Sequence, residues 1–399
     1  MTPVGGTVTA AMPGGEVLAE AALAEHAATV PLVDHHVHGA FTRELSQPEF
    51  EESINEGSPD PVPDWMTQFD SQLGFAIRRW CAPLLGLPAH APAAGYWARR
   101  TELGTQEVTA RLLSAAGVSD WLLDTGYGPD QILSPAGMSA ASGTAAHTIV
   151  RLESIAEEIA AGGGPGRDYP EEFRSRLAAA TAGAVGAVGV KTILAYRTGL
   201  GTDLSQPDEA RVRDAASRWI GSAGPGRPRL TDPVLLSFGL HAATEAGLPI
   251  QFHTGYGDRD LNLDQANPLL LLDFLRDPRT ARVPVLLLHC YPFQREAGYL
   301  AQAFNNVYFD VGLGVNYVGA AAPTLVAESL ELAPFAKQLY SSDAWGPPEL
   351  HYLGAVLWRR AISTVTGRWV DSGDWSAADA RRVISMVARD NALRVYQLG

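Results

Sequence analysis

The feature of this 399-residue chain that most restricts its fold is a series of short aliphatic and β-branched runs, separated by stretches with helical spacing. The runs are almost continuously apolar and do not alternate with polar residues, which is typical of parallel strands buried on both faces. Eight segments have this pattern, and they are Val30–His38, Trp121–Tyr127, His147–Glu153, Val188–Leu194, Pro249–Gly255, Val283–Cys290, Asn306–Gly312 and Gln338–Ala344.

Helical spacing fills most of the intervals between these runs. The clearest stretches are Glu107–Ala116, Pro170–Gly183, Asp208–Ser222, Pro233–Ala246, Asn267–Asp277 and Phe293–Asn305. Strands that alternate with helices imply a parallel α/β fold, and eight such repeats predict a (β/α)8 TIM barrel. The alternative is an open doubly wound sheet, but no glycine-rich phosphate loop follows the first predicted strand.

The domain organisation follows from the same pattern. We expect residues 1–29 to form an N-terminal helical extension, with Glu16–Ala28 as its helix, and residues 30–399 to form the barrel domain. Residues 40–117 are too many for a simple strand-to-helix connection, so this segment predicts a helical insertion over the barrel mouth. Ala377–Leu398 predicts a final helix.

Composition excludes several classes of partner. The chain has 30 basic and 44 acidic residues, a net charge of −14, which argues against a nucleic acid. Its two cysteines lie far apart and outside any CxxC pair, which excludes a disulfide framework and a thiolate zinc site and favours a reducing compartment. No signal peptide is evident, and no apolar run reaches the ~18 residues of a membrane helix. We therefore expect a cytoplasmic protein with a small-molecule substrate and no membrane partner; a homo-oligomer remains open.

Polar side chains stand at the ends of several predicted strands, where barrel active sites lie. They are Asp34, His35, His36, His38, Lys191, His253, His289 and Asp343. Spacing of two along a strand lets His36 and His38 face the same side and bind one ion, while His35 faces away. An isolated HxH is a weak signal, because two histidines can be paired by chance. Combined with a strand-end histidine and a strand-end aspartate, it favours a site for zinc or a similar ion.

These residues carry a specific resemblance. The pattern Asp34-x-His36-x-His38, with His253, His289 and Asp343 on later strands, resembles the amidohydrolase superfamily, which implies a metal-dependent (β/α)8 hydrolase. The segments VDHHVHG, VKTILAYRTGL, FHTGYGD, LLHCYP and YSSDAWG are similar to the amidohydrolase-2 branch, and within it to the amidohydrolase-like portion of FluG-type proteins. The resemblance covers about Val30 to the C-terminus and does not include the glutamine-synthetase-like half of FluG-type proteins.

The resemblance implies a role for each of these positions. His36, His38 and His253 would be metal ligands. Asp343 would be a ligand that also accepts a proton from the attacking water, and His289 a ligand or a polariser of the substrate, so that Asp343 and His289 are the expected catalytic residues. One or two divalent ions are implied, with zinc expected first and manganese or iron as alternatives.

Lys191 stands out because only two of the 30 basic residues, Lys191 and Lys337, are lysine. Many binuclear amidohydrolases carry a carboxylated lysine on the fourth strand, so the resemblance implies that Lys191 is converted to a carbamate that bridges two metal ions. Only a primary amine can form this carbamate, so arginine could not replace the lysine. The alternative is a buried lysine paired with Asp34, Glu153 or a substrate carboxylate. The amidohydrolase-2 branch often works with one metal and no lysine bridge.

Three further residues are candidates for binding substrate. Arg197, just past the fourth predicted strand, can hold a carboxylate with two parallel hydrogen bonds, although a surface salt bridge is an equal alternative. Tyr256 and Trp345 follow His253 and Asp343 in loops that would face the site, and each could equally pack in its wall. Asp124 and Glu153 are expected to orient the histidines.

The sequence therefore predicts a metal-dependent hydrolase that cleaves a C–N bond of the amide type, in a small polar substrate, by metal-activated water. A decarboxylase of the same branch is an alternative, because it would use the same ligands. A non-catalytic amidohydrolase-like signalling or binding protein is a third possibility, which the presence of every expected ligand disfavours.

Overall fold

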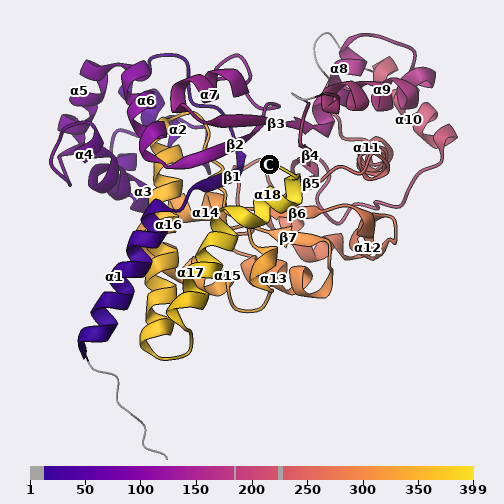
Figure 1. The fold of residues 1–399 in the computed structure, drawn as a ribbon. Helices are drawn as coiled ribbons and strands as arrows, with labels where there is room; N and C mark the ends of the chain where they lie inside the picture. The colour runs from indigo at the N-terminus through magenta and orange to yellow at the C-terminus, as the bar shows by residue number, and fades with distance from the viewer. Residues whose placement is uncertain (1–12, 184–185, 223–227) are drawn as a thin grey trace, which may run out of the picture.

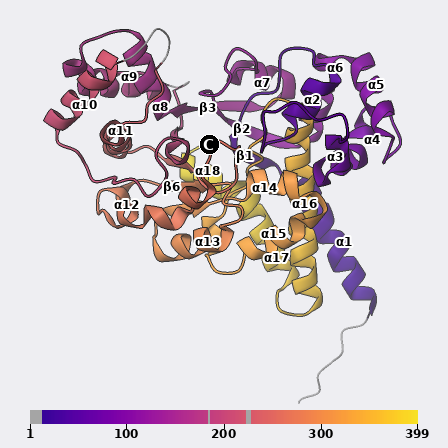
Figure 2. The same cartoon turned by 180° about the vertical axis from the view of Figure 1, so that it is seen from behind.

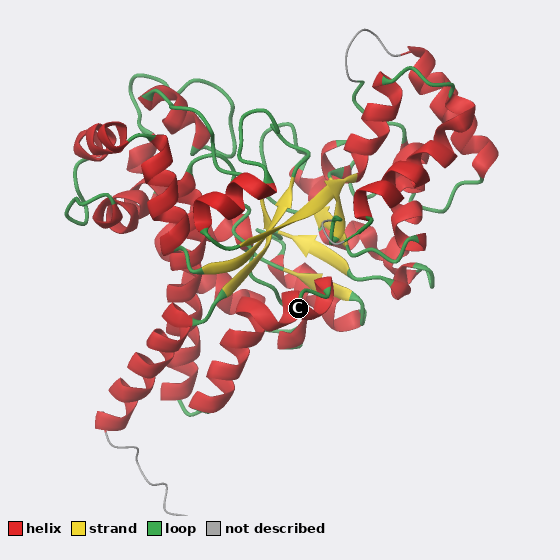
Figure 3. Ribbon diagram, turned by 45° about the horizontal axis from the view of Figure 1, so that its top comes forward, coloured by secondary structure: helices red, strands yellow, loops and turns green. Residues whose placement is uncertain are grey.

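The computed structural model describes residues 13–183, 186–222 and 228–399, and its centre is a seven-stranded parallel sheet. Figure 3 shows the strands gathered in the middle with helices around them. In sheet order they are β1 (Leu32–Val37), β2 (Val118–Asp124), β3 (Ala145–Arg151), β4 (Gly189–Thr192), β5 (Ile250–His253), β6 (Val285–Leu288) and β7 (Val307–Phe309). Seven of the predicted strands are thus confirmed, and the sheet order follows the chain order.

The prediction of an eighth strand at Gln338–Ala344 is wrong, because this segment is irregular. It makes one bridge to β7, where Leu339 N donates to Phe309 O at 3.1 Å, and Asp343 N donates to the His36 carbonyl of β1 at 3.1 Å. Asp343 has φ 48°, in the left-handed region, so a regular extended ladder cannot run through it. The fold is therefore a curled sheet with a hydrogen-bonded segment between β7 and β1, rather than the predicted eight-stranded barrel.

The segment between β1 and β2 is largely helical. It contains α2 (Gln47–Ser53), α3 (Gln72–Ala76), α4 (Ala82–Leu84), α5 (Ala93–Leu103) and α6 (Thr105–Ala115). Figure 1 shows these helices on one side of the sheet and the helices that follow β3 and β4 on the other. Helix α2 begins with a reciprocal capping box, because Ser46 accepts from Glu49 N while the Glu49 carboxylate accepts from Ser46 N.

The remaining helices lie around the sheet or pack on the helices that do. They are α1 (Pro13–Thr29), α7 (Pro135–Ser142), α8 (Leu152–Ala161), α9 (Tyr169–Thr181), α10 (Glu209–Ser222), α11 (Pro233–Glu245), α12 (Leu272–Arg276), α13 (Gln294–Ala303), α14 (Gly312–Val318), α15 (Ala322–Ser329), α16 (Pro348–Asp371), α17 (Ala377–Ser385) and α18 (Asn391–Tyr396). The predicted N-terminal helix is confirmed as α1, which packs along α16. None of the described helices is both long enough and apolar enough to cross a membrane.

The predicted final helix is broken by a π-helical turn at Met386–Asp390, which separates α17 from α18. Helix α18 turns inward, and Ala392, Val395 and Tyr396 pack in one cluster with Val33 of β1 and residues of the neighbouring strands. Figure 2 shows the C-terminus beside the strands. The last helix therefore contributes side chains to the core next to β1.

A buried ion pair joins α5 to α16. The Arg100 guanidinium lies 2.8 Å from the Glu349 carboxylate, and the Tyr96 hydroxyl donates to the same oxygen at 2.9 Å. Both charged side chains are almost completely removed from solvent. Breaking such a pair leaves a buried charge without its partner, which costs more than the pair itself contributes.

We therefore expect Arg100→Ala to lower the free energy of unfolding by about 3–5 kcal/mol. Arg176→Ala is the matched control, because it removes an exposed ion pair to Glu172 within α9 and should cost less than about 1 kcal/mol. Urea unfolding of both variants measures the difference. Equal effects would show that Glu349 does not need its partner.

Candidate active site

Side chains from distant parts of the chain meet around the carboxylate of Asp343. Its Oδ1 lies 2.9 Å from His36 Nε2 and 3.7 Å from His38 Nε2, and its Oδ2 lies 3.3 Å from His289 Nε2. All four side chains are more than nine-tenths buried. The structure thus brings together three histidines and the aspartate that the sequence predicts as metal ligands.

Several of these atoms have no hydrogen-bond partner although they are buried. They are both ring nitrogens of His289, Nε2 of His253 and Oδ1 of Asp343. A buried polar atom without a partner costs about 1–3 kcal/mol, so four of them in one place call for a ligand. The His253 ring is centred 4.8 Å from that of His289.

Imidazole nitrogens and a carboxylate are the donors that zinc and similar ions take, so these residues fit a divalent cation. Among the described residues, two groups of three have all their ligand atoms within 4.8 Å of one another. One group is His36, His38 and Asp124, and the other is His36, His289 and Asp343. His253 belongs to neither set.

Burial sets the protonation of the cluster. It lowers the pKa of His36, His253 and His289 well below the ordinary value, and that of His38 to about 3. The rings are therefore neutral, which is the form that binds metal ions. Burial also raises the pKa of Asp343 to about 6, against the opposing effect of Lys191.

Lys191 lies inside this cluster. Its Nζ is 2.8 Å from His36 Nε2 and 3.3 Å from Asp124 Oδ2, so its ion-pair partner is Asp124 rather than Asp34 or Glu153. Asp34 instead accepts from the backbone and hydroxyl of Ser342. Burial lowers the pKa of Lys191, which increases the fraction of neutral amine.

The sequence predicts that Asp124 and Glu153 both orient histidines, but in the structure only Asp124 contacts one. The carbonyl oxygen of Asp124 lies 3.0 Å from His38 Nδ1, and its carboxylate binds Arg151 and Lys191. Burial alone would raise the pKa of Asp124, but Arg151 and Lys191 together hold it well below the ordinary value. The Glu153 carboxylate accepts from the hydroxyl of Thr192 and the backbone of Ile193, so it binds no histidine.

A cavity of about 750 Å³ opens over the cluster. His38, Lys191, His253 and Asp343 are part of its wall, and residues of the Phe41–Pro59 segment form another part. The first part of the segment after β1 therefore borders the cavity. The volume is in the range of sites for small molecules.

The three predicted substrate-binding residues differ in position. Arg197 and Trp345 line the cavity, whereas Tyr256 is not among the lining residues and its ring packs against Tyr291 and Tyr317. Arg197 Nη2 donates to Glu157 at 2.8 Å, while its Nε is buried without a partner.

Trp345 belongs to an aromatic wall of the cavity. Its ring lies between those of Phe41 and Tyr127, at 4.7 and 5.2 Å between centroids. The indole N–H is buried without an acceptor. Trp345 therefore offers an unused donor in the wall of the cavity that the candidate metal ligands also line.

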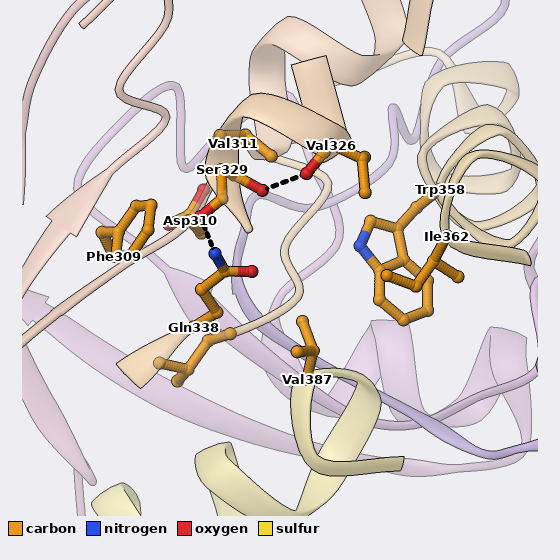
Figure 4. Close-up of a pocket in the computed structure, with 10 residues that line it drawn as sticks. Phe309, Asp310, Val311, Val326, Ser329, Gln338, Trp358, Ile362 and Val387 are labelled. Carbon is orange, nitrogen blue, oxygen red and sulfur yellow. Dashed lines mark hydrogen bonds between the residues drawn. The ribbon is translucent and has the colours of Figure 1, made fainter. Parts of the chain in front are cut away.

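A second cavity, drawn in Figure 4, has a volume of about 10 Å³. Asp310, Ser329, Gln338 and Trp358 are among its lining residues, and the Gln338 amide donates to the Ser329 carbonyl. This is on the order of the space that one water needs. The small cavity cannot hold a substrate, so the large one is the candidate site.

Two of the candidate ligands have an unusual backbone. His289 has φ 69° and Asp343 has φ 48°, although neither is glycine. Left-handed backbone at such residues costs about 1–3 kcal/mol each and is found mainly where function requires it. The strain is consistent with turns that aim these two side chains at each other.

Sequence reasoning missed two residues behind the ligands. Gln251 Oε1 lies 2.9 Å from His36 Nδ1, and Asp310 Oδ1 accepts from His289 N at 3.1 Å. A signal for each was present, because Gln251 stands two residues before His253 on the same strand and Asp310 directly follows β7. Asp310 does not line the large cavity, however, and acts through its hydrogen bond to the backbone of His289.

A parallel α/β sheet that presents histidines, a lysine and an aspartate to one cavity is the arrangement of metal-dependent hydrolases of the amidohydrolase superfamily. A sequence model of the amidohydrolase family matches residues 160–398, more than half of the chain, and the protein therefore belongs to this family.

Individual relatives agree with this assignment. The protein fluG of Emericella nidulans is 32% identical over 283 residues, which cover 64% of this chain but only 32% of the fungal protein. Among solved structures, a candidate metal-dependent hydrolase from Lactobacillus casei is 27% identical with a TM-score of 0.81, over 94% of this chain and 97% of the other. A uronate isomerase from Bacillus halodurans, 15% identical with a TM-score of 0.64 over 98% of both chains, shares the fold.

We expect the protein purified without chelator to contain one or two divalent ions per chain, measured by elemental analysis. Chelation should lower its melting temperature, and zinc, manganese or iron should restore it, because an ion at 100 times its Kd stabilises the fold by about 2.7 kcal/mol. His36→Asn should abolish this response. His147→Asn is the control, since His147 pairs with Asp120 away from the cluster. Metal below about a tenth of an equivalent with no thermal response would contradict the metal site.

Proposed function

We propose that this protein is a metal-dependent hydrolase that cleaves a C–N bond of the amide type in a small polar substrate. The observation that carries the proposal is the group of buried, unpartnered atoms of His253, His289 and Asp343 beside a cavity of about 750 Å³. His36, His38, His253, His289 and Asp343 would hold the ion, with zinc expected first and manganese or iron compatible with the same donors. A divalent ion bound there would supply Lewis acidity and make water nucleophilic at neutral pH.

The residues of the chain supply the proton transfers. Asp343 accepts a proton from the attacking water, and its pKa of about 6 leaves it mainly ionised at neutral pH. The same proton then passes to the leaving nitrogen, so that the products are a carboxylic acid and an amine. His289 acts as a ligand or offsets the charge that develops on the carbonyl oxygen.

Arg197 and Trp345 are the proposed substrate-binding residues. The free Nε of Arg197 is available to a substrate carboxylate, although Glu157 already takes one of its other nitrogens. The free indole N–H of Trp345 is available to an acceptor on the substrate. Tyr256 is left out of the proposal because it packs against other tyrosines.

Lys191 is the proposed ligand of a second ion, as a carbamate. Its position between His36 and Asp124, and a pKa lowered by burial, support this role, because only the neutral amine reacts with carbon dioxide. Two ions in the wild type and one in Lys191→Ala are expected. Two ions retained in Lys191→Ala would favour the plain ion pair with Asp124.

The alternative reaction is decarboxylation. The same ligands and Arg197 would then hold a carboxylate that leaves as carbon dioxide. A non-catalytic binding protein is less well supported, because every ligand expected from the family pattern is present. We expect the protein to work in the cytoplasm, where its two buried, unpaired cysteines remain reduced.

Isotope labelling separates these reactions. In ¹⁸O-labelled water, a hydrolase places one label in the product carboxylate, because the attacking oxygen comes from solvent. A mass-spectrometric screen of amides and carboxylic acids provides the substrate, and the metal-free protein is the control. Stoichiometric carbon dioxide with no label in any product would overturn the hydrolase proposal.

Asp343→Asn should reduce turnover on the order of 100-fold or more, because the amide cannot accept a proton at neutral pH. Metal content and rate are to be measured on the same preparation, since the amide is also a poorer ligand. Asp130→Asn, at a residue not among those lining the cavity, is the matched control. A fully metallated Asp343→Asn variant with a near-native rate would leave Asp343 without a catalytic role.

A further inference from the structure

A continuous line of buried hydrogen bonds runs from Asp310 to the metal ligand His36 and passes through the C-terminal helix. Asp310 Oδ2 lies 3.0 Å from His35 Nε2, and His35 Nδ1 lies 3.0 Å from the hydroxyl of Tyr396 in α18. Gln251 Nε2 donates to this hydroxyl at 2.8 Å, and Gln251 Oε1 lies 2.9 Å from His36 Nδ1. All five side chains are buried.

The direction of the first bonds follows from Asp310. Its other oxygen, Oδ1, accepts from the backbone of His289 and Gly312 and from the Ser341 hydroxyl, so the carboxylate acts as an acceptor. His35 Nε2 therefore carries a hydrogen. In a neutral ring, Nδ1 is then the acceptor, and the Tyr396 hydroxyl donates to it. The opposite direction would leave the Tyr396 proton without an acceptor, because the other partner of this hydroxyl is an amide N–H.

The direction of the remaining bonds follows from Gln251. Its Nε2 donates to the His35 carbonyl and to Tyr396, both at 2.8 Å, which uses both amide hydrogens. The amide oxygen must then face His36, and an oxygen without hydrogen can only accept. His36 Nδ1 therefore carries the hydrogen, and Nε2 keeps the lone pair that a metal ion needs.

Lys191 leads independently to the same tautomer. In the metal-free protein, before the proposed carboxylation, Lys191 forms an ion pair with Asp124 as an ammonium group, which has only donors, and its Nζ lies 2.8 Å from His36 Nε2. His36 Nε2 must therefore be an acceptor. This nitrogen is also the one that lies 2.9 Å from Asp343.

We propose that Tyr396 is a positioning residue of the metal site, which acts through Gln251 to hold His36 in the tautomer that binds metal. Without the Tyr396 hydroxyl, the Gln251 amide keeps only the His35 carbonyl as an acceptor. Its orientation is then less strongly fixed, and a rotated amide that presents Nε2 to His36 becomes more populated. The ring would then place its hydrogen on Nε2 and lose its lone pair towards the ion. Metal binding thus depends on the docking of the last helix. The inference rests on the proposed metal site but not on the proposed reaction.

The tautomer can be measured directly, by ¹⁵N NMR of the metal-free protein labelled at histidine, with His36 assigned from His36→Asn. The wild type should show His36 with its hydrogen on Nδ1, and Tyr396→Phe should show a mixture of both tautomers. Tyr169→Phe is the matched control, because the Tyr169 hydroxyl is buried without a hydrogen-bond partner. A wild-type His36 with its hydrogen on Nε2 would overturn the proposal, even if no variant folds.

Zinc affinity, measured by competition with a chelator, tests the consequence. Tyr396→Phe should bind zinc roughly 10-fold or more weakly than the wild type, as for other residues that orient a ligand. Adding Gln251→Glu to Tyr396→Phe should restore the Nδ1 hydrogen and part of the affinity, because a buried carboxyl group is protonated, so that its O–H donates to the His35 carbonyl while its other oxygen accepts from His36 Nδ1. A merely structural loss would not be rescued in this way. Tyr396→Phe with the affinity of Tyr169→Phe and an unchanged His36 tautomer refutes the positioning role, whereas a wild type that binds no zinc refutes the metal site alone.

Discussion

The close approach of the Asp343 carboxylate to the imidazoles of His36 and His289 is the constraint that the surrounding structure has to satisfy. Polar atoms are held 2.9–3.3 Å apart in a buried place, and several of them have no hydrogen-bond partner. Such an arrangement is unfavourable by itself and must be stabilised by the fold around it. An ion that binds these atoms would give them partners, and the removal of this free-energy cost would contribute to its affinity.

The surrounding structure holds these side chains in place through hydrogen bonds to the backbone of the Asp343 segment and to the Nδ1 atoms of His36 and His38. The irregular segment that carries Asp343 is held between β7 and β1, and the left-handed backbone at His289 and Asp343 turns both side chains inward. His38 and His36 are each held at Nδ1, by Asp124 and Gln251 respectively. The ligand geometry is therefore a property of several strands and of the last helix together.

The fold limits the chemistry without selecting it. The protein belongs to the amidohydrolase family, and the solved structures that share its fold include a uronate isomerase. The cavity wall of this chain offers two unpartnered N–H groups, Trp345 Nε1 and Arg197 Nε, and the segment after β1 forms part of its border. A ligand cluster of this kind can serve more than one reaction, so the proposed selectivity for substrate lies in the cavity wall.

The sequence by itself determined the parallel α/β architecture and the candidate ligands, because buried strands are continuous apolar runs and a polar residue at the end of such a run is conspicuous. His36, His38, His289 and Asp343 could be read in this way, and they meet as predicted. Only the tertiary structure decided that Gln338–Ala344 is irregular, that Lys191 pairs with Asp124, and that Tyr396 lies behind His36. These features depend on contacts between residues more than 60 positions apart, or on a strained backbone turn that such contacts stabilise. No local sequence pattern indicates contacts of this kind.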